Sequence, residues 1–214
     1  MSTRGSVSVI VGALALLALG TTPSRAADGV PLAVPLEVSV SSGVHLLNSN
    51  DTAFPETFMG IPVVGSVAYR ITEIWAVEGE FSYVVPIEKD VDVAPGVTVK
   101  RKTPDQLAYL ASVRATLPLK GTPWLPYATV GAGGITFLSD EDVKRLPALA
   151  KSQTAFAASL GVGVGYRLTP QWVLLVDVRG LVAFPSKDAE GLSTGGSADP
   201  IWMERGTVGV KYCF

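Results

Sequence analysis

The chain has 214 residues, of which 48% are hydrophobic and only 17% are charged, and its formal net charge at pH 7 is −2. A soluble domain of this size usually carries more charge, and the charge balance gives no sign of a nucleic-acid-binding surface. After the first twenty residues, no apolar run reaches the roughly 18 residues that a transmembrane helix needs. The single cysteine, Cys213, excludes an intramolecular disulfide and a cysteine-based zinc site.

The N-terminus reads as a secretory signal over Met1–Ala26. Arg4 supplies the positive charge, Val7–Leu19 the apolar segment, and Ala26 a small residue for cleavage. A membrane anchor is the alternative, but the apolar run is short for one. Residues 27–34 would then form a short periplasmic tail ahead of a barrel domain at 35–214.

The rest of the chain alternates between apolar and polar residues with a period of two, which predicts β-strands. In the first strand, for example, Val38 and Val40 share one face, and Ser39 and Ser41 share the other. Eight strands are expected, at Leu36–Leu46, Phe58–Ile71, Trp75–Val85, Asp105–Leu117, Trp124–Ile135, Phe156–Tyr166, Trp172–Phe184 and Ile201–Phe214.

The connections between these strands are alternately long and short. The long ones are Leu47–Thr57, Pro86–Pro104, Thr136–Gln153 and Pro185–Pro200; the short ones are Thr72–Glu73, Pro118–Pro123 and Leu168–Pro170. A sheet that crosses a bilayer has to close, because an open edge leaves backbone groups unsatisfied in hydrocarbon. The fold class expected is therefore all-β, an antiparallel eight-stranded up-and-down transmembrane barrel.

A soluble, lipocalin-like barrel with its apolar face inward is the alternative. The polar face, however, is rich in Gly, Ala and Ser and has few charges, which suits a narrow lumen better than a solvated exterior. The aromatic residues also gather at the two strand ends, as membrane interfaces favour. The short-connection belt would hold Tyr69, Trp75, Trp124, Tyr166, Trp172, Tyr212 and Phe214, and the long-connection belt Phe58, Tyr83, Phe137, Phe156, Phe184 and Trp202.

The last strand ends on an aromatic residue at the end of the chain. Thr207, Gly209, Tyr212 and Phe214 fit the pattern polar-x-Gly-x-x-aromatic-x-Phe. This resembles the C-terminal assembly signal of bacterial outer-membrane barrels, and residues 35–214 resemble the small eight-stranded barrels of the OmpA/OmpX type. The resemblance implies an outer-membrane protein with both termini periplasmic, recognised by the barrel assembly machinery through its last strand.

The polar face carries charges of both signs, which would lie in the lumen. They are Glu37, Arg70, Glu78, Glu80, Arg114, Asp177, Arg179, Arg205 and Lys211. An eight-stranded barrel has room for side chains rather than an open channel, and desolvated charges need partners. The pattern therefore predicts a salt-bridged plug; a gated ion path lined by the same groups is the alternative.

His45, the only histidine, lies on the lumen face of the first strand according to the alternation of faces along that strand. Ser49 and Asp51 lie in the adjacent connection. A few barrels of this class modify lipid A with a His and a Ser or Asp near the outer rim, but they place these residues at the membrane side. We therefore expect no catalytic residues in this chain. Ser139–Leu146 could cap a short helix or form an acidic tip.

Lys100, Arg101 and Lys102 form a basic triplet that could contact lipopolysaccharide phosphates, or could be an ordinary solvated loop. No cofactor-binding or metal-binding pattern is present, and Gly161, Gly163 and Gly165 alternate at strand spacing as lumen packing would require. The expected function is structural or interactive, as a surface-loop scaffold or a subunit of an envelope assembly. Outer-membrane lipid and other envelope proteins are the expected partners. A small-solute channel and a lipid A-modifying enzyme are the alternatives.

Overall fold

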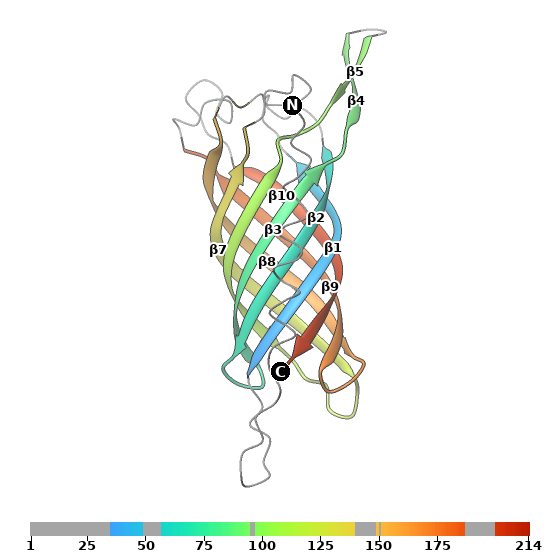
Figure 1. The fold of residues 1–214 in the computed structure, drawn as a ribbon, viewed down its shortest axis with the longest axis vertical. Helices are drawn as coiled ribbons and strands as arrows, with labels where there is room; N and C mark the ends of the chain where they lie inside the picture. Colours follow the sequence, from blue (N-terminus) through green and yellow to red (C-terminus); the bar gives the residue numbers. More distant parts are fainter. Residues whose placement is uncertain (1–34, 49–56, 95–96, 140–148, 150, 187–199) are drawn as a thin grey trace, which may run out of the picture. The chain divides into compact units, whose positions relative to one another are not determined.

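The computed structural model describes residues 35–48, 57–94, 97–139, 149, 151–186 and 200–214. Its main body is a closed antiparallel barrel in which the strands follow the order β1-β10-β9-β8-β7-β6-β3-β2 (Figure 1). The strands are β1 (Leu36–Asn48), β2 (Phe58–Arg70), β3 (Trp75–Pro86), β6 (Gln106–Thr116), β7 (Trp124–Phe137), β8 (Gln153–Arg167), β9 (Trp172–Phe184) and β10 (Ile201–Cys213). The predicted all-β, eight-stranded fold is confirmed. The expected signal at 1–26 and the tail at 27–34 lie outside the described residues.

The alternation in the sequence becomes an alternation of burial along each strand. On β2, exposed Ile61 and Val63 face outward, and buried Val64 and Ser66 face the lumen. The outer surface of the barrel is accordingly apolar, as a membrane-facing surface must be. Among the described residues, no helix is long and apolar enough to cross a membrane.

Two short strands lie in the connection that was expected to be a long polar segment, Pro86–Pro104. β4 (Lys89–Ala94) and β5 (Val97–Arg101) pair with each other as a separate two-stranded sheet. Figure 1 shows them at the end of the barrel where the long connections lie. A second difference is that β8 begins at Gln153, three residues earlier than the sequence pattern indicated.

The aromatic belts are confirmed in part. At the short-connection end, Trp124 packs edge-on against Tyr166 with ring centroids 4.8 Å apart, and Trp172 packs against Tyr212 at 5.0 Å. At the other end, Phe156 stacks on Phe184 at 6.1 Å, and Trp202 on β10 is exposed.

Phe58 and Phe137 do not belong to the outer belt, and that prediction was wrong. Both side chains are buried, at 1% and 0% exposure. Strand parity sends them into the lumen, so proximity to a strand end was not enough to place them at the interface.

The belts give a physical check on the span of the barrel. Trp202 and Tyr212, at opposite ends of the outer face of β10, are ten residues apart. At about 3.3 Å per residue and a tilt of about 45°, they are separated by about 23 Å along the barrel axis. This matches the apolar band of about 25 Å in outer-membrane barrels.

Candidate functional site in the barrel lumen

The lumen holds a cluster of charged side chains that come from five of the eight strands. β1 supplies Glu37, β3 supplies Glu78 and Glu80, β6 supplies Arg114, β9 supplies Asp177 and Arg179, and β10 supplies Arg205 and Lys211. Each of these eight residues is at most 8% exposed. Four are acidic and four are basic, so the cluster balances its own charge.

Arg114 joins two carboxylates on different strands. Its Nη2 donates to Glu37, and its Nη1 donates to Glu78 Oε2 at 2.7 Å. Lys211 Nζ donates to the same Glu37 carboxylate at 3.1 Å. The ring of Tyr127, an inward residue of β7, lies 6.0 Å from the Arg114 guanidinium. Arg114 therefore holds β1, β3 and β6 together through charge-assisted hydrogen bonds.

The same chain of contacts continues across the lumen through Arg179 and Arg205. Arg179 Nη1 donates to Glu80 Oε2 at 2.7 Å, and its other nitrogens lie 3.6 Å from Glu78 Oε1 and 3.4 Å from Asp177 Oδ1. Arg205 Nη2 lies 2.8 Å from Glu80 Oε1, and its Nη1 donates to Ser82 Oγ at 3.3 Å. An unbroken series of ion pairs therefore runs from Lys211 to Arg205.

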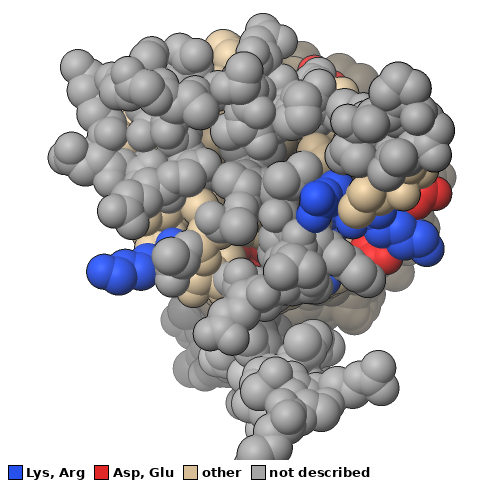
Figure 2. Space-filling view, turned by 90° about the horizontal axis from the view of Figure 1, so that it is seen from above, with Lys and Arg blue, Asp and Glu red and all other residues tan. Residues whose placement is uncertain are grey.

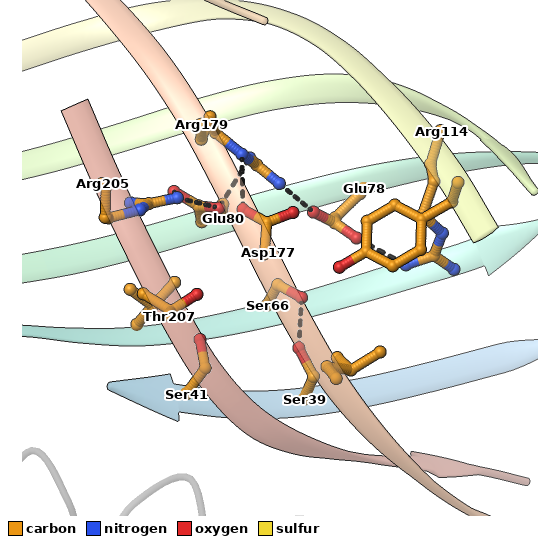
Figure 3. A pocket seen from close by; sticks show the side chains of 13 residues that line it. Ser39, Ser41, Ser66, Glu78, Glu80, Arg114, Asp177, Arg179, Arg205 and Thr207 are labelled. Carbon is orange, nitrogen blue, oxygen red and sulfur yellow. Dashed lines mark hydrogen bonds and ion pairs between the residues drawn. The ribbon is translucent and has the colours of Figure 1, made fainter. Parts of the chain in front are cut away.

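A small polar cavity lies beside the ion pairs, with a volume of about 30 Å³. Figure 3 shows Ser39, Ser41 and Ser66 on one side of it and the charged residues on the other. The Oγ atoms of Ser39 and Ser66 are 2.8 Å apart. A space of this size accommodates about two water molecules, so the cavity has room for hydration and not for a solute path.

The end of the lumen nearest the long connections is mostly apolar, although Gln106, the cross-strand partner of Phe137, is buried there too. The buried cluster there comprises Leu47, Ala108, Leu110, Ile135, Phe137, Leu149, Ala155, Ala157, Leu181, Ala183, Ile201 and Met203. Most of these residues lie near the strand ends, farther toward the long connections than the charged residues. Leu149 comes from the connection between β7 and β8 and is 3% exposed. The lumen thus has two layers, one of ion pairs and one made mainly of hydrocarbon side chains.

Two features of this lumen were not anticipated from the sequence. The pattern predicted a polar inner face along the whole barrel, and it did not single out Tyr127 as a neighbour of Arg114. The sequence does contain a signal for the apolar layer, because Leu47, Leu181 and Met203 stand at positions of their strands whose side chains point into the lumen. Reading that signal requires knowing that the barrel closes, which brings these strand ends together.

The remaining residues singled out from the sequence do not belong to the ion pairs. Arg70, at the end of β2, is half-buried and not enclosed with the other charges. Thr207 and Gly209 lie on β10, where Thr207 faces the cavity, and Tyr212 is near the end of that strand. Phe214 follows it in the chain. Ser49, Asp51 and residues 140–146 of the possible helix cap lie outside the described residues.

The basic triplet does not form one basic patch. In the β4–β5 sheet, Lys100 lies opposite Asp90 and Arg101 lies opposite Lys89, so that neighbouring residues of the triplet point to opposite faces. Lys102 follows the end of β5. Figure 2, which views the molecule from above, shows basic and acidic side chains close together in this part of the described surface.

His45 is inside the barrel, as its parity predicted. Its side chain is 4% exposed, and its cross-strand neighbour on β10 is Arg205. Among the described residues, no group of three or more His, Cys, Asp and Glu side chains is placed to hold a metal ion. Cys213 is half-buried, with its Sγ 4.0 Å from Glu37 Oε1.

Comparison with known proteins gives a consistent result. Residues 11–214 match the model of a family described as outer membrane protein beta-barrel domain. Among solved structures, Neisserial surface protein A is 15% identical, with 85% of this chain and 99% of that chain covered and a TM-score of 0.56. The N-terminal β-barrel domain of Pseudomonas aeruginosa OprF is 13% identical, with coverages of 84% and 96% and a TM-score of 0.52. For OprG of the same organism, the values are 15%, 85%, 97% and 0.50. These identities show a common fold alone. No curated protein sequence matches the chain.

Proposed function

Because this chain belongs to the family of outer-membrane β-barrel domains, we propose that it is a barrel closed to solutes, with a structural or interaction role. The long connections between its strands would lie outside the cell and carry that role. Both termini would be periplasmic, since the short connections of such barrels face the periplasm.

The observation that carries the proposal is the double closure of the lumen. A path for ions would have to pass the ion pairs around Arg114 and then the apolar layer around Phe137 and Met203. Moving an ion through the second layer means removing its hydration in a region of low dielectric, which is costly. With the interior filled, recognition would fall to the connections, since loops on a rigid scaffold commonly carry binding.

The two alternatives receive less support from the geometry. A solute channel would need a continuous path, whereas the cavity beside Glu78 and Arg179 has a volume of only about 30 Å³. A lipid A-modifying enzyme would need its base at the membrane side, whereas the His45 side chain lies inside the barrel. We therefore propose a non-enzymatic role without a cofactor.

The partners we propose follow from location and charge. Outer-membrane lipid surrounds the apolar exterior, and Lys100, Arg101 and Lys102 would contact lipopolysaccharide phosphates. Because Lys100 and Arg101 point to opposite faces of the hairpin, these two side chains would not contact the same lipid surface. The assembly machinery would recognise β10, and other envelope proteins would bind the long connections.

The test is cross-linking on intact cells, followed by identification of the proteins that copurify from outer membranes. A matched variant replaces Lys89–Arg101, the β4–β5 hairpin, with a short Gly-Ser turn, and heat modifiability on a detergent gel verifies that the barrel still folds. We expect a stoichiometric protein partner of the wild type that is weakened or lost in the variant, since the hairpin extends away from the end of the barrel (Figure 1).

Cross-linking to lipid alone would contradict the interaction role. A partner retained in full by the hairpin variant would assign recognition to other connections. Mass spectrometry of lipid A, from cells with wild-type protein and with His45→Ala, examines the enzymatic alternative in the same strains. A lipid A modification that depends on His45 would overturn the non-enzymatic assignment.

A further inference from the structure

The apolar outer surface of the barrel contains a single charged residue, Glu204 on β10. Its neighbours along the strand, Met203 and Arg205, point into the lumen, so the Glu204 side chain points outward and is exposed. Between the two aromatic belts, every other outward residue in the described parts of the eight barrel strands is uncharged. Glu204 lies two residues along the tilted strand from Trp202, so its carboxylate is about 5 Å inside the apolar band.

The chain itself offers this carboxylate no partner. A carboxylate that faces hydrocarbon is unfavourable unless it is paired, and ionisable residues at such positions commonly mark a functional contact. The cross-strand neighbours of Glu204 are Leu46 and Gly180, which have no polar side-chain groups. Within the described part of the chain, no hydrogen bond or ion pair includes Glu204. Compensation for its charge therefore has to come from another molecule.

Two glycines adjoin Glu204 on the outer surface. Gly180 lies directly across from it on β9, and Gly206 is the next outward residue of β10. A Cβ atom on Gly206 would meet no atom within 4 Å, and one on Gly180 would meet only the Leu160 carbonyl oxygen, at 3.8 Å. The barrel itself therefore does not require glycine at either position. A glycine inside a strand weakens it and often marks a place where another backbone approaches closely.

Prominent apolar side chains surround these glycines. Leu160 pairs with Gly180, Val178 pairs with Gly206, and Val208 is the next outward residue after Gly206. Their exposures are 67%, 58% and 63%. The outer wall of β8, β9 and β10 thus has a hollow with an apolar rim and a carboxylate at one side.

The charge of the hollow restricts what can occupy it. The charged groups of outer-membrane lipid nearest to this depth are phosphates, which a carboxylate repels. A second copy of this chain offers no Lys or Arg at this depth on the outward faces of its described strands. A cationic side chain of a different membrane protein satisfies both conditions, and small residues in the wall let its backbone come close.

We propose that Glu204, with the hollow at Gly180 and Gly206, is a docking site within the membrane for a transmembrane segment of another protein that presents a Lys or Arg. The site deepens the interaction role proposed above by adding a contact in the barrel wall. It does not use the long connections, so the two contacts can be tested separately.

The experiment uses synthetic single-span peptides as the partner. Wild-type protein is refolded into phosphatidylcholine vesicles with a Leu-Ala helix that carries one lysine about 5 Å inside its interfacial tryptophan and a diazirine-bearing leucine analogue one turn away. Matched peptides carry leucine or glutamate in place of the lysine. After irradiation, mass spectrometry maps the adducts. We expect the lysine peptide to label Leu160, Val178 and Val208 about fivefold more than Val77 and Val113 on the other side of the barrel, and the leucine peptide to show no such preference.

Three variants separate the charge from the hollow. Glu204→Gln keeps the size of the side chain and should abolish the preference of the lysine peptide. Glu204→Lys should transfer the preference to the glutamate peptide. Gly206→Leu keeps the carboxylate, fills the hollow and should also reduce the labelling. Gly79→Leu, at an outward glycine on β3 whose Cβ has equally free space, is the matched control and should behave as wild type.

Heat modifiability confirms that each variant is folded before it is mapped. Even labelling around the wall of the wild-type protein by the lysine peptide would overturn the proposal. So would a preference that persists in folded Glu204→Gln, or an equal preference shown by the leucine peptide. These results would leave the role of the long connections intact, because the hairpin variant tests that role in cells.

Discussion

At the residue scale, the stability of the lumen depends on side chains that each satisfy several partners. Arg114 is the clearest case, because it binds Glu37 and Glu78 at once. A buried ion pair contributes little net stability compared with a hydrophobic pair, but removal of one partner leaves a charge buried without compensation. The series of pairs from Lys211 to Arg205 therefore makes every member costly to remove.

Replacing Arg114 with alanine should lower the free energy of unfolding by roughly 3 kcal/mol, the lower end for breaking a buried ion pair. The lower end applies because Glu37 keeps Lys211, and Glu78 keeps Arg179 at 3.6 Å. Urea unfolding of refolded protein in lipid vesicles measures the difference. Arg167→Ala, at an exposed position on β8, is the matched control and should change the free energy by about 0.5 kcal/mol or less. Equal unfolding midpoints for the two variants would contradict the role given to Arg114.

Much of this residue-scale arrangement could be predicted from strand parity alone. Parity places Glu37, Glu80 and Arg179 on the face opposite the valines, and the structure has them inside the barrel. It could not specify which charges pair, because the partners are distant in sequence: Lys211 and Glu37 are 174 residues apart. Pairing is decided by strand order and stagger, which only the closed barrel defines.

At the element scale, we propose that β10 has two roles that can be separated experimentally. Its inward side chains, Arg205 and Lys211, belong to the ion pairs, and its outward Tyr212 packs on Trp172. The terminal Phe214 belongs to the pattern that resembles an assembly signal. The first role concerns stability of the finished barrel, and the second, which we propose from that resemblance, would concern its delivery into the membrane.

Phe214→Ala should reduce the amount of protein assembled in the outer membrane of cells while leaving refolding into detergent micelles unaffected. The reason is that the residue is expected to act through recognition by the assembly machinery rather than through the barrel core. Heat-modifiable protein in outer-membrane fractions, compared with refolding yield of purified chain, measures both. Trp202→Ala, an outward aromatic at the other end of β10, is the control. A parallel loss in cells and in micelles would indicate a structural role for Phe214 instead.

The individual strands also show which elements the sequence pattern predicted and which it missed. The eight barrel strands were predicted because each presents a long apolar face with a period of two. The β4–β5 hairpin was missed although Val91, Val97 and Val99 alternate with polar residues on either side of Pro95-Gly96, a turn-forming dipeptide. Strands of six and five residues give too few repeats to be distinguished from a polar loop.

At the scale of the whole molecule, closure converts eight half-apolar strands into a membrane protein with a filled interior. The outward faces form the surface toward lipid, and the inward faces near the long connections form the apolar layer around Phe137 and Leu110. The layer is assembled from several strands. The sequence could therefore predict that these side chains point inward, but not that they contact one another. The two layers together are the basis for assigning function to the connections.

The central claim, that the lumen is closed, is tested most directly by recording from the wild-type protein in a planar lipid bilayer. We predict conductance at the background level, and we predict the same for Arg114→Ala, because the apolar layer remains when the ion pairs are weakened. Reconstitution is verified by heat modifiability of the protein recovered from the same vesicles. Large, steady single-channel currents from the wild-type protein would contradict the account and establish a solute channel in its place.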